Sequence, residues 1–194
     1  MKLNKRAPPG AVKAGLLAKI ESAKAGAAKT GALRRILGVD PGLSFAGWGL
    51  VEIGGSRIRY IAHGCIETKA GSPRAERLFS IYTAFREVLA AYEPVESAME
   101  TLFFARNVSS ALPVAEARGV LCMALAERGL QVREFSPNAI KQAVTGTARA
   151  DKAQVQEMVR FILGLAAIPK PDHAADALAA AICAANHGIA LEEG

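Results

Sequence analysis

Three short apolar runs follow one another closely between residues 36 and 66, and each has the composition of a β-strand. The runs are 36–39, 48–53 and 58–66, and the breaks between them contain Pro41-Gly42 and Gly54-Gly55. Proline and glycine pairs of this kind mark tight turns. The sequence therefore predicts that the fold begins with an antiparallel meander of three strands.

After Pro73 the apolar residues change to a helical period. They are spaced three or four apart as far as Tyr92, which predicts a helix over 73–92. Further along we expect strands at 95–99 and 130–135 and helices at 111–128, 137–144, 151–164 and 172–186, with Asp151 as an N-cap. A meander that leads into crossover helices is typical of an α/β layer fold. We predict a mixed five-stranded sheet flanked by helices.

The net charge of +6 belongs entirely to the first 33 residues. They hold seven Lys and Arg against one acid, Glu21, whereas basic and acidic residues cancel in the rest of the chain. The charge is therefore no evidence that the folded part binds nucleic acid. A length of 194 residues suits a single domain. We predict a basic, flexible N-terminal extension (1–33), one domain (34–188) and a C-terminal tail (189–194).

Cysteine usage and hydropathy exclude several classes of protein. Cys65, Cys122 and Cys183 lie about 60 residues apart, which predicts neither a disulfide framework nor a metal clip. No apolar run has the length of a membrane span, and the N-terminus lacks the apolar segment of a secretory signal. We expect a cytoplasmic protein in a reducing compartment. A transit peptide is the alternative for 1–33, although this segment uses Lys and Ala where such peptides favour Arg and Ser.

Two acidic residues follow predicted strands. Asp40 ends the first strand directly before Pro41-Gly42, and Glu100 follows the strand at 95–99. Ligands of α/β proteins collect outside the ends of central strands, so both carboxylates are candidates for a site. The alternatives are that Asp40 belongs only to the turn and that Glu100 is a solvated surface residue.

A histidine and an aspartate share one face of the last predicted helix. His173 and Asp176 are three residues apart, and alanines around them would allow that face to approach another layer closely. A carboxylate on an otherwise apolar face is costly unless a cation or hydrogen bonds compensate it. His173 could also be an ordinary histidine near a helix start. Asp172 is four residues before Asp176 and could assist the site or act as an N-cap.

Together, the strand-end acids and the helical pair would form a site of carboxylate oxygens with one imidazole nitrogen. Carboxylates this close repel one another, so the arrangement makes sense with divalent cations. Two such cations about 3.5–4 Å apart can activate a water and stabilise the leaving oxygen of a phosphodiester. The sequence has no Gly-x-Ser-x-Gly or Cys/His nucleophile signature, which favours phosphoryl over acyl chemistry.

Several blocks of the sequence resemble the RuvC family of Holliday-junction resolvases. They are Ile36 to Gly42 with Gly47-Trp48-Gly49, Ala98 to Asn107 continuing into Ser110 to Leu112 and Ala117 to Val120, Pro137 to Gly146, Asp151 to Val155, and Ala174 to Ala179. The blocks have the order and spacing of the family from about residue 35 to 187. The resemblance implies an RNase H-like fold and a homodimer that makes paired symmetric nicks in a four-way DNA junction.

Carried over by position, the resemblance makes Asp40, Glu100, His173 and Asp176 the catalytic, metal-binding set. It implies Mg²⁺, two ions per site with Mn²⁺ as a substitute, and water as the nucleophile without a covalent enzyme intermediate. It further implies work in recombination and DNA repair beside the RuvA and RuvB branch-migration proteins. The helix from Ala111 onward is a candidate dimer surface, since a two-fold substrate suits a two-fold protein.

The same resemblance suggests the residues that contact DNA. They are Phe103, Phe104, Arg106, Asn107, Ser110, Lys141 and Lys152, with Arg118 and Arg149 as further basic candidates. An aromatic residue at position 103 would stack on bases opened at the crossover. Two adjacent phenylalanines are otherwise typical of a hydrophobic core, and single basic residues are often only solvated.

Three other functions fit parts of the sequence. A non-cleaving junction-binding protein could share the fold, although Asp40, Glu100 and Asp176 are all present. An ATP-binding module of the actin or sugar-kinase type also has Asp-x-Gly after its first strand, but a domain of this length is too short for two lobes. A nuclease for other DNA or RNA substrates on the same fold is the third.

We predict that Phe103→Ala weakens cleavage of a four-way junction and barely changes the melting temperature. Each base stacked on an aromatic side chain contributes about 1–3 kcal/mol to binding. The measurement is junction cleavage beside a thermal melt of the same protein. A large drop in melting temperature would instead favour a core position for Phe103.

Overall fold

The structure is a computed structural model that describes residues 33–102 and 108–192, with the backbone alone for 108–110 and 189–192. Its elements in chain order are β1 (Arg34–Asp40), β2 (Phe45–Gly54), β3 (Arg57–Glu67), α2 (Arg74–Tyr92), β4 (Glu96–Glu100), α3 (Val108–Glu127), β5 (Val132–Phe135), α4 (Pro137–Thr145), α5 (Lys152–Ile162) and α6 (Asp172–Glu192). Every strand and helix predicted from the sequence is present.

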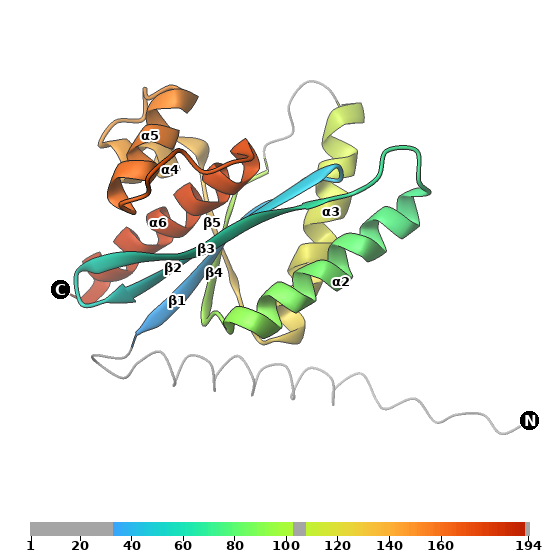
Figure 1. The fold of residues 1–194 in the computed structure, drawn as a ribbon, viewed down its shortest axis with the longest axis horizontal. Helices are drawn as coiled ribbons and strands as arrows, with labels where there is room; N and C mark the ends of the chain where they lie inside the picture. Colours follow the sequence, from blue (N-terminus) through green and yellow to red (C-terminus); the bar gives the residue numbers. More distant parts are fainter. Residues whose placement is uncertain (1–32, 103–107, 193–194) are drawn as a thin grey trace, which may run out of the picture.

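The strands form one five-stranded sheet in the order β3-β2-β1-β4-β5. β1 to β3 are an antiparallel meander, whereas β4 runs parallel to both β1 and β5. The sheet is therefore mixed, as predicted. Helices α2 and α3 cover one face, and α6 lies on the other with α4 and α5 packed against it (Figure 1). None of the helices in the described part of the chain is long and apolar enough to cross a membrane.

Side chains of the central strands alternate between the two faces of the sheet. In β1, Val39 packs with α2 and α3, whereas Ile36 packs with α6. In β4, Met99 faces α2 and α3, and Ala98 faces α6. Because successive side chains of a strand point to opposite faces, the last residue of each of these strands is directed toward α6.

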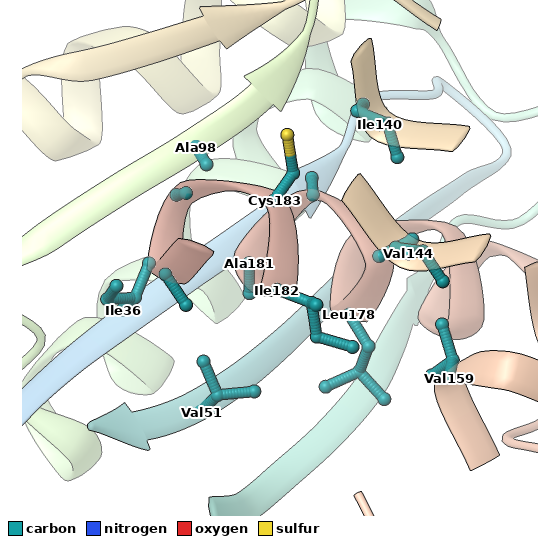
Figure 2. Close-up of a cluster of buried hydrophobic side chains, with 14 of the residues drawn as sticks. Ile36, Val51, Ala98, Ile140, Val144, Val159, Leu178, Ala181, Ile182 and Cys183 are labelled. Carbon is teal, nitrogen blue, oxygen red and sulfur yellow. The ribbon is translucent and has the colours of Figure 1, made fainter. Parts of the chain in front are cut away.

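The core between the sheet, α4, α5 and α6 is centred on α6. Figure 2 shows Leu178 and Ile182 of α6 among apolar side chains from β1, β2, α4 and α5. Both residues are fully buried. Most of the other buried residues of α6 are alanines, whose small side chains allow neighbouring elements to pack close to the helix backbone.

Helix α6 lies very close to the sheet because glycines face it. A Cβ added to Gly38 of β1 would lie 1.8 Å from the carbonyl oxygen of Ala177. One added to Gly47 of β2 would lie 2.1 Å from the carbonyl oxygen of His173. No side chain larger than hydrogen fits at either position. The expectation that small residues allow this face of α6 to approach another layer closely is confirmed.

The start of α5 is the predicted one. Asp151 is its N-cap and accepts a hydrogen bond from the backbone N–H of Gln154 at 2.9 Å, while the Gln154 side chain accepts one from the N–H of Asp151. This reciprocal pair is a capping box. The helix ends at Ile162, two residues before the predicted end, because Gly164 adopts the left-handed conformation at φ 63°.

Several other boundaries also differ from prediction, and three of them are examples. β5 begins at Val132, because Leu130 is buried without pairing in the sheet. α3 begins at residue 108 and includes Pro113. α6 continues past the predicted end at residue 186 to Glu192. Hydrophobic periodicity reports burial, and burial and hydrogen-bonded pairing do not begin at the same residue.

We predict that Gly38→Ala lowers the free energy of unfolding by more than about 3 kcal/mol, since the new methyl group meets backbone atoms that cannot move independently. Chemical denaturation measures the change. Gly119→Ala is the matched control, because Gly119 lies exposed in α3 with nothing near its missing Cβ. That substitution should stabilise the helix by about 0.5–1 kcal/mol. Equal stability of the two variants would contradict the close packing.

Candidate active site

Asp40 is the last residue of β1, and the alternation of the strand directs its side chain toward α6. Its partner in the neighbouring strand is Gly47, the glycine on which His173 rests. As a result, the imidazole lies directly beside the carboxylate. His173 Nδ1 and Asp40 Oδ2 are 2.6 Å apart and share a hydrogen bond.

Asp176 completes a group of three. One ligand atom from each of Asp40, His173 and Asp176 lies within 4.8 Å of the others. Asp40 comes from the sheet, and the other two come from the face of α6 that their spacing predicted. Two carboxylate oxygens and an imidazole nitrogen at this separation can bind a divalent cation.

Glu100 lies near this group without belonging to it. Glu100 is the last residue of β4 and lies two residues after Ala98, which faces α6. Side chains two apart in a strand lie on the same face of the sheet, so Glu100 also faces α6. It lines a pocket of about 260 Å³ that also contains Asp176, Lys141 and Lys152. Its carboxylate therefore shares this pocket with Asp176, whereas Asp40 and His173 do not line it. The last residues of β1 and β4 lie at the same end of the sheet, and the charge of Asp40 contributes to the raised pKa of Glu100.

The pKa values of the carboxyl groups reflect this crowding. Burial raises the pKa of Asp40 above its ordinary value, and the charge of Asp176 adds to the rise, while the hydrogen bond with His173 opposes it. Burial also raises the pKa of Glu100, with further contributions from the charges of Asp40 and Asp176 and an opposing one from Lys141. A site that disfavours its own negative charge is suited to a cation.

Lys152 supplies part of the compensating charge. Its Nζ lies 3.1 Å from Asp176 Oδ2 and 3.5 Å from Asp172 Oδ2. Burial works against the charge of Lys152, but the two aspartates outweigh it and raise the pKa of the ammonium group. Asp172 also accepts a hydrogen bond from Lys170 at 2.9 Å, which lowers its pKa. Asp172 is the first residue of α6, and its carboxylate forms ion pairs with Lys152 and Lys170. It does not belong to the group of three ligand residues.

The predicted DNA contacts divide into three sets. Phe103, Phe104, Arg106 and Asn107 lie outside the described residues, and Ser110 is described only as backbone within α3. Lys141 and Lys152 line the pocket beside the acids. Arg149 is exposed in the loop before α5, whereas Arg118 is mostly buried, with 13% of its side chain exposed.

One residue of the site was absent from the sequence-based candidates. Phe45, the first residue of β2, stacks on the imidazole of His173 with ring centroids 5.6 Å apart and planes at 13°. It restricts the ring of a predicted ligand. Sequence alone held no signal for this role, because a phenylalanine after a turn is usual in any strand.

The comparison with known proteins covers nearly the whole described domain. The profile of the family described as crossover junction endodeoxyribonuclease RuvC matches residues 36–184. Relatives with the same description include those of Heliobacterium modesticaldum, 50% identical over 151 residues, and Chloroflexus aurantiacus, 52% identical over 158 residues. The alignments cover 78% and 81% of this chain and 93% and 96% of the relatives.

Solved structures agree with the sequence comparison. The structure of Thermus thermophilus RuvC in complex with a Holliday junction substrate matches with a TM-score of 0.76 and 35% identity, covering 81% of this chain and 96% of that one. The yeast mitochondrial Holliday junction resolvase Ydc2 matches with a TM-score of 0.60, covering 92% of this chain and 86% of that one. At 14% identity, this second match concerns the fold alone.

We predict that Asp40→Asn raises the melting temperature of the metal-free protein at about pH 7 and that the gain disappears at about pH 3. The pKa of Asp40 is raised in the folded state, so the ionised carboxylate opposes folding at neutral pH. Below the unfolded-state pKa of about 3.9, both states are protonated and the difference vanishes.

Asp172→Asn is the control of opposite sign for this prediction. The pKa of Asp172 is lowered by Lys170, so its charge stabilises the fold above the unfolded-state pKa and this contribution is lost on acidification. The substitution should lower the melting temperature at about pH 7, and this effect should shrink as the pH falls below the unfolded-state pKa of about 3.9 toward the lower folded-state pKa. Thermal melts in a chelator across this pH range measure both. A drop in melting temperature for Asp40→Asn at neutral pH would contradict the electrostatic picture.

Proposed function

Since the chain belongs to the RuvC family of crossover junction endodeoxyribonucleases, we propose that it resolves Holliday junctions with Asp40, Glu100, His173 and Asp176 as its catalytic residues. The observation that carries the proposal is the short distance between three of these residues. One ligand atom each of Asp40, His173 and Asp176 lies within 4.8 Å of the others. The reaction is hydrolysis of DNA phosphodiester bonds, by paired nicks placed symmetrically in opposing strands.

We propose that the four residues bind Mg²⁺, two ions per site, with Mn²⁺ as a substitute. The donor set supports this, because carboxylate oxygens are the ligands that these hard cations prefer. Burial, with repulsion between neighbouring carboxylates, raises the pKa values of Asp40 and Glu100, and a bound cation would offset both effects. When bound, the cations would activate a water and stabilise the leaving oxygen.

The protein side chains have roles of their own in this site. The hydrogen bond between His173 Nδ1 and Asp40 Oδ2 fixes the imidazole beside the carboxylate. Phe45 holds the plane of this ring. Lys141 and Lys152 line the pocket beside the acids, where ammonium groups would bind the phosphates of the strand to be cut.

The remaining assignments follow the family. We propose a four-way junction as the substrate, Phe103, Phe104, Arg106, Asn107 and Ser110 as further DNA contacts, a homodimer, and cooperation with RuvA and RuvB. We assign the nuclease domain to 34–188 and expect the basic extension over 1–33 to add DNA affinity that is independent of sequence and sensitive to salt. The two sequence relatives named above are bacterial, and we place the activity in the cytoplasm, where bacterial DNA lies.

A non-cleaving junction-binding protein is the main alternative. The approach of Asp40, His173 and Asp176 argues against it, because binding alone gives no reason to bring carboxylates together at a cost in charge repulsion. A nicking assay on a synthetic mobile four-way junction, with and without Mg²⁺, distinguishes the two. Binding without metal-dependent nicks would overturn the proposal.

We predict that Asp176→Asn loses at least about 100-fold in cleavage rate while still binding the junction, because a neutral amide is a much weaker metal ligand. His173→Asp should retain part of the activity, since it replaces one metal ligand by another. Single-turnover cleavage and a mobility-shift assay in a chelator measure the two properties.

Asp172→Asn is the matched control on the same helix, because its carboxylate binds lysines and lies outside the group of three. Its cleavage rate should stay within a few-fold of the unmodified protein. Equal residual cleavage in Asp176→Asn and His173→Asp would contradict the assignment of these two roles.

A further inference from the structure

Arg118 of α3 makes contacts unlike those of a surface residue that awaits DNA. Its Nη1 donates a hydrogen bond of 2.9 Å to the backbone carbonyl oxygen of Glu100. Its Nη2 lies 2.7 Å from Glu134 Oε1, as a charge contact rather than an aligned hydrogen bond. Only 13% of its side chain is exposed. The guanidinium therefore contacts residues at the ends of β4 and β5.

These contacts lie on the face of the sheet opposite to the metal-binding group. The neighbours of Arg118 in α3, Ala117 and Leu121, belong to the core between the sheet, α2 and α3. Glu134 lies two residues after Val132 in β5, so both side chains point to the same face of the sheet, and Val132 packs on that same core. The Glu100 side chain points the other way, toward α6. Arg118 therefore binds the backbone carbonyl of Glu100 from the α2 and α3 side of the sheet, while the carboxylate of Glu100 lines the pocket on the α6 side.

Within the described part of the chain, the end of β4 pairs with β5 and not with β1. The last pair of the β4–β5 ladder is Glu100 with Phe135, and the N–H of Thr101 donates to the Phe135 carbonyl oxygen at 2.8 Å. β1, the strand on the other side, pairs with β4 only as far as Met99. Hydrogen bonds to a charged donor are about twice as strong as neutral ones. The bond from Arg118 is therefore a main constraint on the place of Glu100.

We infer that Arg118 is a positioning residue for the cleavage reaction, which acts by holding Glu100 in line with Asp40 and Asp176 and does not bind the DNA itself. The inference rests on the proposed function. It replaces the interpretation of Arg118 as a DNA contact, because the guanidinium contacts a backbone carbonyl and a carboxylate and only 13% of the side chain is exposed to a phosphate. Glu134 holds the guanidinium in this orientation.

The test compares Arg118→Met with Arg133→Met in the full-length protein. Arg133 is a matched control, because it also binds one backbone carbonyl, that of Ala184, and one glutamate, Glu96. Glu96 is at the opposite end of β4 from Glu100. Both variants lose a hydrogen bond to a carbonyl and an ion pair, and Arg133→Met also loses a cation–π contact with Phe135 at 5.3 Å, so it should lose at least as much thermal stability as Arg118→Met. Only Arg118→Met should lose function at temperatures where both are folded.

For Arg118→Met we expect a single-turnover cleavage rate about 10- to 100-fold lower, the usual effect of losing a residue that supports a metal ligand. Binding of Mn²⁺, measured by calorimetry without DNA, should weaken by a similar factor. The junction Kd in a chelator should change less than about threefold, with an unchanged salt dependence. Arg118→Lys should recover part of the rate, since an ammonium can donate to the carbonyl but cannot also hold Glu134.

Three results would overturn the inference. A weaker junction Kd with a salt slope reduced by about 1 would make Arg118 a phosphate contact. A loss of rate in Arg133→Met equal to that in Arg118→Met would make the effect one of general stability. Normal cleavage and Mn²⁺ binding by Arg118→Met would remove the role altogether. Absence of junction cleavage by the unmodified protein would instead overturn the proposed function.

Discussion

The contact between α6 and the glycines of the sheet is the constraint on which the site depends. Gly38 and Gly47 allow the backbone of the helix to lie against β1 and β2, where any side chain would collide with it. His173 then rests on the strand partner of Asp40, so the imidazole and the carboxylate come within hydrogen-bonding distance. Alanines along α6 make the same approach possible from the other side. The close packing of α6 on the sheet therefore also sets the distance between His173 and Asp40 in the site.

This arrangement brings together groups that repel one another. Asp40, Asp176 and Glu100 lie near one edge of the sheet, and burial with mutual repulsion raises the pKa of Asp40 and Glu100. Lys152 offsets part of the charge through Asp176, and Arg118 holds Glu100 through its backbone carbonyl. Carboxylates held this close to one another cost free energy unless another charge compensates them. The same electrostatic reasoning explains why Asp172, paired with lysines at the surface, has a lowered pKa instead.

Much of this structure could be predicted from the sequence. The meander, the crossover helices and the mixed sheet follow from the spacing of apolar residues and from turn residues, which act locally. The capping box at Asp151 is also local, since both partners lie within four residues. Element ends were less predictable, as at β5, where Leu130 is buried by α3 and the sheet without joining a strand. Burial depends on residues that are distant in sequence.

The sequence by itself determined the residue types of the site and their strand-end and helix-face positions, because those follow from periods of two and of about 3.6 residues. Only the tertiary structure decided which of them meet. Asp40, His173 and Asp176 form the close group, while Glu100 faces it from the next strand. Phe45 became a partner of His173, and Arg118 a support for Glu100, through contacts across 128 and 18 positions of sequence. Distances between elements depend on how closely the layers pack, and no local pattern encodes them.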